Sequence, residues 1–310
     1  MKKFLKYLAV FLLPIAILFI ACEVLLWNIP NDYRKKRQYL DDHSQEVEVL
    51  ILGASHALTG LNPEYFSYKA YNAAYVSQTF DVDYLILEKY KDQWNNLKYI
   101  ILPVSYPSLY EQLHTTSDYW RLNDYARYAD LPTATDMWYR SELLNNKLWY
   151  NLYRIADYYL LGNPAIVCDD NGWRRKPYNP EIDMADSGKT AAKRHTIEDS
   201  ACLKDNLRLL NEIIRFCSER KVQLILCTLP AYHTYVDNLD EKQYREFIET
   251  TRTIADENPN VYYLNLLNDP DFTIEDFSDS DHLSDSGAEK ASIILNDCIE
   301  EGEEYIFSEQ

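Results

Sequence analysis

The chain has 310 residues, 47% of them hydrophobic, so it can bury a sizeable core, and a globally disordered chain is excluded. Its net charge of −18 argues against nucleic acid as a partner, because phosphate contacts need a basic face. The six cysteines are too few for a disulfide scaffold at this length, and no Cys/His group has metal-ligand spacing. We therefore expect no metal and no cofactor, and leave open a disulfide between Cys168 and Cys202.

The charge is unevenly spread along the chain. Residues 1–37 hold seven basic and two acidic side chains, whereas the rest is strongly acidic. Within this basic start, Leu8–Trp27 is almost entirely apolar, and its twenty residues span roughly 30 Å as a helix. We predict a single-pass membrane anchor over residues 1–28 and a polar linker over 29–46. A cleaved signal peptide stays an alternative, because "FIAC" ending at Cys22 resembles a lipoprotein cleavage box.

Beyond the linker, short apolar runs alternate with helical patterns. The strands are predicted at Val47–Ala54, Lys69–Ala74, Leu97–Ser105, Val222–Pro230 and Asn260–Leu267, and the helices at Asp81–Trp94, Leu203–Arg220, Glu241–Glu257 and Ser284–Glu301. This alternation is typical of an α/β fold in which helices cover both faces of a parallel sheet. We assign residues 47–310 to this domain.

An insertion separates the third and fourth strands, at about residues 106–202. Its first half is rich in Tyr and Trp and partly helical, and its second half is polar and loop-like. Loops after strand ends build the ligand sites of open α/β sheets, so the insertion is interpreted as a lid or substrate groove. The alternative is an aromatic subdomain that packs on itself.

Three polar residues, far apart in the sequence, have the chemistry of a serine nucleophile. Ser55 follows the first strand, and Asp279 and His282 lie three residues apart just before the last helix. Serine needs a base within hydrogen-bond reach and a third group that orients the base. Because both segments follow strand ends, we expect them to meet at one edge of the sheet. Asp281 competes with Asp279 for the orienting role.

The neighbouring polar residues are given lesser roles. His56 directly follows Ser55 and points elsewhere in a turn, so we expect a local hydrogen bond or a supporting role. Arg174 and Arg175 either meet an anionic substrate or belong to a solvated loop. An α/β-hydrolase elbow is a poor fit, because Ala57 stands where the second glycine of Gly-x-Ser-x-Gly belongs.

Five short segments carry a family resemblance: "LILGASHALTGLNPEYF", "YNAAYVSQ", "IILPVS", "LILCTLP" and "DSDHLSDSGA". Together they resemble the SGNH/GDSL hydrolase superfamily, and in particular its membrane-anchored cell-envelope branch of alginate O-acetyltransferase-like and teichoic-acid D-alanyl-transfer proteins. The resemblance covers about residues 45–105 and 203–302. It implies a flavodoxin-like three-layer α/β/α fold with a five-stranded parallel sheet, and a catalytic domain outside the cytoplasm.

The resemblance also implies roles for individual residues. Ser55 corresponds to the nucleophile and supplies an oxyanion N–H, His282 to the base and Asp279 to its partner. The family's second-block glycine is replaced here, so Ala74 or a neighbour has to donate to the oxyanion. The third-block asparagine is also absent from "PVSYPS", which leaves Ser105 or Tyr106 as the third donor, or none. Losing one such donor costs about 10²–10³ in rate.

The expected function is a serine esterase or O-acyltransferase that acts on a cell-envelope glycan or its acyl donor through an acyl-enzyme. Its expected partners are the membrane, that polysaccharide or acyl ester, and a multi-span membrane acyltransferase. Two alternatives remain: a non-catalytic, membrane-tethered binding or assembly protein that keeps the fold, and a simple carboxylester or lipid esterase.

Overall fold

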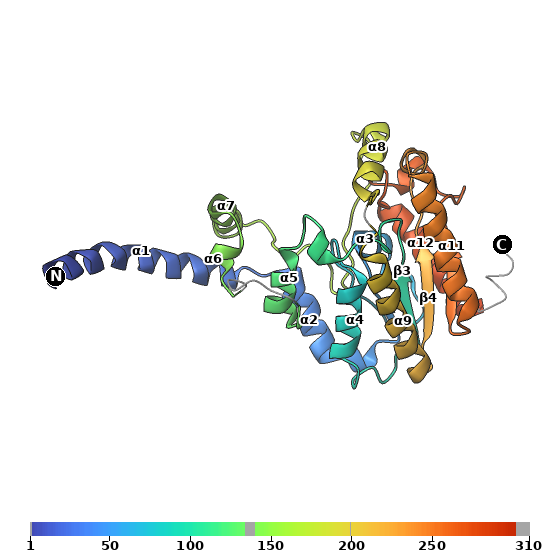
Figure 1. The fold of residues 1–310 in the computed structure, drawn as a ribbon, viewed down its shortest axis with the longest axis horizontal. Helices are drawn as coiled ribbons and strands as arrows, with labels where there is room; N and C mark the ends of the chain where they lie inside the picture. The colour runs from blue at the N-terminus through green and yellow to red at the C-terminus, as the bar shows by residue number, and fades with distance from the viewer. Residues whose placement is uncertain (1, 134–139, 199, 302–310) are drawn as a thin grey trace. The chain divides into compact units, whose positions relative to one another are not determined.

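The computed structural model describes residues 2–133, 140–198 and 200–301 and contains one parallel sheet. The strands lie in the order β2-β1-β3-β4-β5 (Figure 1). Their bounds are β1 Val49–Ile51, β2 Ala70–Asn72, β3 Tyr99–Pro103, β4 Gln223–Thr228 and β5 Val261–Asn265. The predicted α/β fold with a five-stranded parallel sheet flanked by helices is confirmed.

Seven helices of the described residues flank the sheet, and two of the longest, α9 and α11, form where the sequence has apolar residues at helical spacing. The seven helices are α3 Ser55–Gly60, α4 Phe80–Lys89, α8 Met184–His195, α9 Leu203–Arg220, α10 His233–Val236, α11 Glu241–Glu257 and α12 Asp285–Glu301. Helix α11 begins where the Asp240 side chain accepts the Gln243 N–H at 2.9 Å, an N-cap that fixes its first turn. The predicted bounds of α9 and α11 agree with the structure.

The core lies on both faces of the sheet. Val49, Ile51, Ile101 and Ile225 form one buried cluster together with apolar residues of α3 and α12. Side chains alternate along a strand, so the fully buried Leu50, Ile100 and Leu224 face the other way. Helices α4 and α9 contact each other and lie in front of the sheet in Figure 1.

The order of the strands fixes where a ligand site can form. Strand β1 lies between β2 and β3, and the chain leaves it first to β2 on one side and then crosses to β3 on the other. The direction of winding therefore reverses between β1 and β3. In open parallel sheets, the crevice beyond the carboxyl ends of the strands at such a reversal is where ligands bind.

The chain divides into two compact units. The larger, residues 39–119 and 168–310, contains the sheet, and the smaller comprises residues 1–38 and 120–167. The smaller unit holds α1 Lys2–Asn28, most of α2 Asp32–His43, α5 Arg121–Asp124, a π-helical turn Tyr125–Ala129, α6 Glu142–Asn145 and α7 Leu148–Tyr159. Among the described residues, α1 is the one helix long and apolar enough to cross a membrane. This division places residues 120–167 of the predicted insertion with α1 rather than with the sheet.

Two segments differ from the sequence-based expectation. The segment 29–46, expected as a polar linker, forms α2 and a 3-10 turn, because Asn31 accepts the Arg34 N–H at 3.0 Å and Tyr33 and Leu40 are buried. The polar second half of the insertion, expected as a loop, contains α8, which the Asp183 side chain caps by accepting N–H groups from Ala185 and Asp186. All six cysteines are free thiols, Cys168 and Cys202 included.

Candidate active site

The turn between β1 and α3 presents Ser55 at the edge of the sheet. Gly53 adopts φ +104°, a region that residues with a Cβ rarely enter, and this lets the strand turn sharply. Its N–H donates to Asp83 Oδ1 on α4 at 2.9 Å, and its carbonyl accepts the Tyr75 N–H. Ser55 is the first residue of α3, where backbone N–H groups have no partner inside the helix. Its N–H is therefore available to a ligand.

A tight loop before α12 presents His282. The Asp279 Oδ1 atom accepts the backbone N–H groups of Asp281, at 3.2 Å, and of His282, at 2.9 Å. The Ser278 N–H donates to the His282 carbonyl at 2.9 Å and closes the loop. Short acidic side chains favour this local hydrogen bonding, so the sequence Asp-Ser-Asp-His folds back on itself. The loop brings the Asp279 carboxylate to the imidazole of its own His282.

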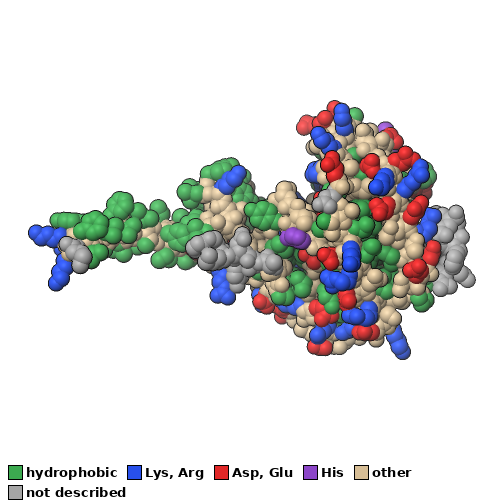
Figure 2. All heavy atoms as spheres, viewed as in Figure 1, with side chains coloured by type: hydrophobic (Ala, Val, Ile, Leu, Met, Phe, Trp, Pro, Cys, Tyr) green, Lys and Arg blue, Asp and Glu red, His purple; other side chains and the backbone are tan. Residues whose placement is uncertain are grey.

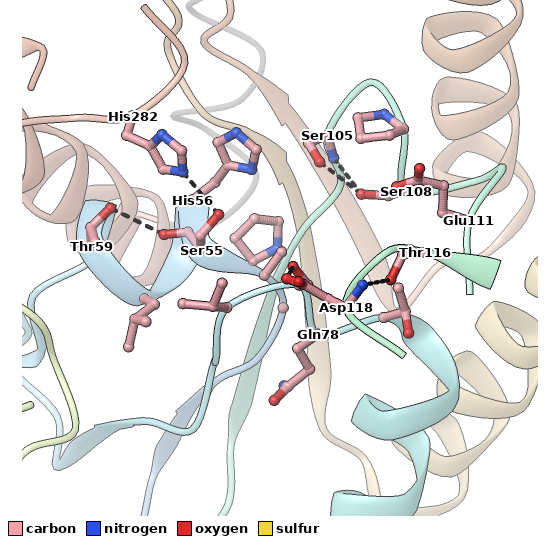
Figure 3. Close-up of a pocket in the computed structure, with 18 of the residues that line it drawn as sticks. Ser55, His56, Thr59, Gln78, Ser105, Ser108, Glu111, Thr116, Asp118 and His282 are labelled. Carbon is pink, nitrogen blue, oxygen red and sulfur yellow. Dashed lines mark hydrogen bonds between the residues drawn. The ribbon is translucent and has the colours of Figure 1, made fainter. Parts of the chain in front are cut away.

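The structure brings Ser55, His282 and Asp279 together in one chain of hydrogen bonds. His282 Nε2 lies 2.9 Å from Ser55 Oγ (Figure 3), and His282 Nδ1 lies 2.9 Å from Asp279 Oδ1 on its other side. With its proton on Nδ1, the neutral ring donates to Asp279 and leaves Nε2 to accept the serine proton. These are the distances that a nucleophile, its base and the orienting acid require.

The charges around the imidazole favour its protonated form. Burial disfavours it, but hydrogen bonds to the Asp279 and Asp281 carboxylates outweigh burial and raise the pKa of His282 above its ordinary value of 6.5. Burial also opposes ionisation of Asp279, yet the hydrogen bond from His282 lowers the pKa of that carboxyl. The surrounding carboxylates thus stabilise a positive charge on the His282 ring.

A second set of ionisable groups surrounds Asp281. Its Oδ1 atom lies 3.6 Å from His282 Nδ1, and its Oδ2 atom lies 3.7 Å from His56 Nε2 and 3.4 Å from the Arg194 guanidinium. Although burial opposes its charge, the imidazoles of His282 and His56 hold the pKa of Asp281 well below its ordinary range. Asp279 is the closer partner of His282, and Asp281 is a second carboxylate that faces the same nitrogen.

Two histidines complete this surrounding. The ring of His56 stacks on that of His282, with centroids 4.8 Å apart and planes 13° apart, and burial lowers the pKa of His56. Burial lowers the pKa of His195 to about 3, and its Nδ1 lies 3.0 Å from the Tyr235 hydroxyl. Both rings are therefore neutral near pH 7. The local hydrogen bond expected for His56 is not formed, because its Nδ1 has no hydrogen-bond partner among the described residues and its Nε2 faces Asp281, and a supporting role stays a prediction.

A cavity of about 780 Å³ opens beside Ser55 and His282. The loops after β1 and β3 line it, together with residues of the insertion. Among the lining residues are Val76, Ser77, Gln78, Ser105, Ser108, Glu111, Asp118, Arg174, Arg175, Lys176, Arg194 and His195. The cavity thus has a cationic wall from 174–176 and Arg194, and carboxylates elsewhere. Its size suits a drug-sized or sugar-sized ligand.

The residues predicted as additional oxyanion donors are engaged elsewhere. The Ala74 N–H donates to Asn72 Oδ1 at 3.0 Å, and Ala74 does not line the cavity. The Ser105 N–H donates to Ser108 Oγ, and the two hydroxyls lie 2.9 Å apart, as Figure 3 shows. The segment just after Ala74, residues 76–78, lines the cavity instead.

Several residues of the site were not found from the sequence. Asp83 is buried beneath the Ser55 turn, and burial raises its pKa to about 7. Asp83 lies three residues after Phe80 and four before Leu87, on the apolar face of α4. This helical spacing is the signal that could have identified Asp83 as a buried carboxyl. Lys176 Nζ lies 2.5 Å from Asp279 Oδ2. No role was predicted for Lys176, because it belongs to a polar, loop-like segment of the sequence. The guanidinium of Arg175 is paired with Asp285 and largely exposed.

One group of side chains in the described part of the chain has the spacing of metal ligands. Ligand atoms of His56, Asp281 and His282 lie within 4.8 Å of one another. The His282 nitrogen on the Asp281 side is Nδ1, so a metal ion there would compete with the hydrogen bond between Nδ1 and Asp279.

The sequence matches no protein-family model and no curated protein. One similar solved structure is described as "a putative platelet activating factor from Streptococcus pneumonia". The two chains share 11% sequence identity, with a TM-score of 0.42, over 94% of this chain and 98% of the other. At this identity and TM-score, the match says nothing about the chemistry of this chain.

Proposed function

We propose that the protein is a serine-dependent esterase or O-acyltransferase of the SGNH type. The single observation that carries the proposal is the hydrogen-bonded chain Ser55–His282–Asp279 at the mouth of a cavity. His282 Nε2 takes the Ser55 proton while Ser55 Oγ attacks the ester carbonyl carbon. The imidazolium then returns this proton to the departing alkoxide, and the acyl group stays on Ser55.

The second half of the reaction reverses these roles. Water or a sugar hydroxyl gives its proton to His282 and attacks the acyl-enzyme, and Ser55 recovers its proton as the acyl group leaves. The oxyanion of both tetrahedral intermediates accepts the Ser55 N–H, which is available at the start of α3. A second donor would come from the backbone N–H groups of Val76 or Ser77 rather than from Ala74 or Ser105, because the Gln78 N–H donates to the Tyr75 carbonyl.

The expected setting is the cell envelope. Helix α1 supports a membrane anchor by its length and composition, and we propose from the family resemblance that the sheet domain lies outside the cytoplasm. Of the cationic side chains that line the cavity, Arg175, Lys176 and Arg194 pair with Asp285, Asp279 and Asp281, so the lining favours no net charge on the glycan or acyl ester that we propose as substrate. The acyl donor is then an ester presented at the membrane, with a multi-span acyltransferase as the partner that supplies it.

Replacement of the nucleophile tests this function. Ser55→Ala should lower release of acetate from an acetyl ester by about 10⁴-fold or more and abolish labelling by a fluorophosphonate probe. Ser117→Ala, another serine that lines the cavity, is the matched control and should keep both activities. Wild-type protein that is neither labelled nor active would favour a non-catalytic binding protein, and equal activity in Ser55→Ala would refute Ser55 as the nucleophile. Adding a sugar acceptor separates transfer from hydrolysis, including hydrolysis of a lipid ester.

A further inference from the structure

Helix α7 is amphipathic, but it packs against the protein with its polar face rather than with its apolar face. In a soluble protein, the apolar face of such a helix points inward. Here the polar Asn151 is fully buried, and its side-chain amide donates to the carbonyls of Glu142 and Leu143. The Arg154 guanidinium also points inward, and it pairs with Glu142 at 2.6 Å. The polar face of α7 is therefore the side held by the protein.

The apolar face of α7 is left uncovered. The exposed fractions are 60% for Leu148, 67% for Trp149, 49% for Leu152, 52% for Tyr153 and 80% for Leu160. Leu144 and Leu161 extend the same surface, and Figure 2 shows hydrophobic side chains over α7 as well as along α1. A continuous apolar surface of this kind marks an interaction site. Trp, Tyr and Leu on one helix face are also the side chains that favour the boundary between lipid headgroups and acyl chains.

A carboxylate within α1 fixes the depth of this surface. Glu23 accepts hydrogen bonds, at 2.7–3.0 Å, from Trp27 Nε1, Ser141 Oγ and the backbone N–H groups of Glu142 and Leu143. An acidic residue inside an apolar helix is thereby fully paired, and it holds the start of α6 against α1. At the other end of α7, the Tyr159 hydroxyl donates to the Leu25 carbonyl at 3.0 Å.

These contacts place α7 beside the last two turns of α1. Glu23 lies five residues before the end of the helix, about 8 Å along its axis. An interfacial helix sits about 5–10 Å into the headgroup–acyl boundary, so the two depths agree. The basic residues 34–37 follow directly, and the Arg34 guanidinium donates to the Trp27 carbonyl at 3.1 Å. Basic side chains just past an apolar span belong among the headgroups.

We infer that α7 is a second membrane element, an interfacial helix whose face Leu148–Trp149–Leu152–Tyr153–Leu160 lies in the bilayer surface at the carboxyl end of α1. The occupant of the uncovered face is lipid, because the face continues the apolar surface of α1 at interfacial depth. The inference depends on the proposed anchoring by α1 and is independent of the proposed reaction.

The test measures depth with a fluorophore on the full chain in phosphatidylcholine–phosphatidylglycerol vesicles. The partly exposed Cys22 and Cys202 are replaced by serine, and an NBD group is attached to one introduced cysteine: Leu152→Cys on α7, Ile15→Cys in the middle of α1, or Lys242→Cys on the exposed face of α11. Lipids that carry a spin label near the headgroup or deep in the acyl chain quench a fluorophore at the matching depth.

We expect the shallow label to quench most of the fluorescence at residue 152, the deep label to quench that at residue 15, and neither to affect residue 242. Quenching at 15 without quenching at 152 overturns the inference and leaves the anchor intact. Absence of quenching at both positions overturns the anchor and the inference together. Self-quenching at 152 that disappears on dilution, without quenching by lipid, assigns the face to a second copy of the chain and also overturns it. Tyr153→Cys repeats the test if Leu152→Cys does not fold.

Discussion

The buried carboxyl beneath the nucleophile turn leads to a quantitative prediction about stability. Asp83 is 1% exposed, and its Oδ1 atom accepts the Gly53 N–H at 2.9 Å and the Gln78 side-chain amide at 2.6 Å. Asp83→Asn retains a carbonyl oxygen as acceptor for both donors and removes the possibility of a buried charge. We expect this substitution to stabilise the protein at alkaline pH and to have little effect at acid pH.

The magnitude follows from the pKa of Asp83. Burial raises it from 3.8 to about 7, a shift of about 3 units, and each unit corresponds to 1.36 kcal/mol. Because the folded state holds this proton more tightly than the unfolded state, stability falls as the pH rises from about 4 to about 7. The ionised carboxyl therefore costs the folded protein about 4 kcal/mol above pH 7. Asp83→Asn removes this cost.

Thermal unfolding of the full chain in detergent, at pH 4 and pH 8, is the measurement. The gain in Tm should be near zero at pH 4 and on the order of 10 °C at pH 8. As a control, Asp83→Ala removes the same charge but leaves the buried Gly53 N–H unpaired, so it should be less stable than Asp83→Asn by about 1–3 kcal/mol at either pH. An equal gain at both pH values, or none at pH 8, would refute the assignment of Asp83 as a neutral buried carboxyl.

Three further outcomes follow from the site and the fold. Asp279→Asn should lower kcat of the proposed esterase by about 10⁴-fold with little change in KM, measured by steady-state kinetics, because a neutral amide does not stabilise the His282 imidazolium and can hold the ring in the wrong tautomer. The rate should rise with pH through an inflection above 6.5, since the base must be neutral, and Asp281→Asn should move this inflection to lower pH; an unmoved profile would contradict the role of Asp281. Gly172→Ala should unfold the loop beside β2 or prevent expression, as scored by Tm and yield, because φ is +84° and a Cβ would lie 2.1 Å from the Asn72 carbonyl oxygen.

The parts of the fold that depend on hydrophobic periodicity were predictable. Helix α9 has apolar residues at helical spacing over its whole length, and its bounds Leu203–Arg220 follow from that pattern. The strands were recognised as continuous apolar runs, but the predicted runs exceed β1 and β4 by several residues. Hydrophobicity continues into the turns because the residues around Gly53 are buried beneath α3 and α4. A strand ends where its backbone stops pairing with the neighbouring strand, even though apolar residues continue beyond that point.

The placement of Ser55 and His282 was also predictable, because topology alone brings the loops after parallel strands to one edge. Their surroundings were not. Lys176 and Arg194 reach Asp279 and Asp281 from the insertion, whose sequence has no periodicity that fixes a path. Contacts of this kind depend on how a long loop returns to the sheet, and local propensity carries no information about that return.

The reversed helix α7 shows why an amphipathic pattern does not by itself decide which face is buried. Burying the apolar face is favourable by about 25 cal/mol per Å², but the same gain is available from lipid. Lipid cannot replace the contacts of the polar face. The buried carboxylate of Glu142 pairs with the guanidinium groups of Arg127 and Arg154, and removing either partner would leave a buried charge unpaired at a large cost in stability. Where a membrane can cover the apolar face, the polar network determines the orientation. A sequence reading that assumes water on every side therefore assigns the wrong face of α7 to the core.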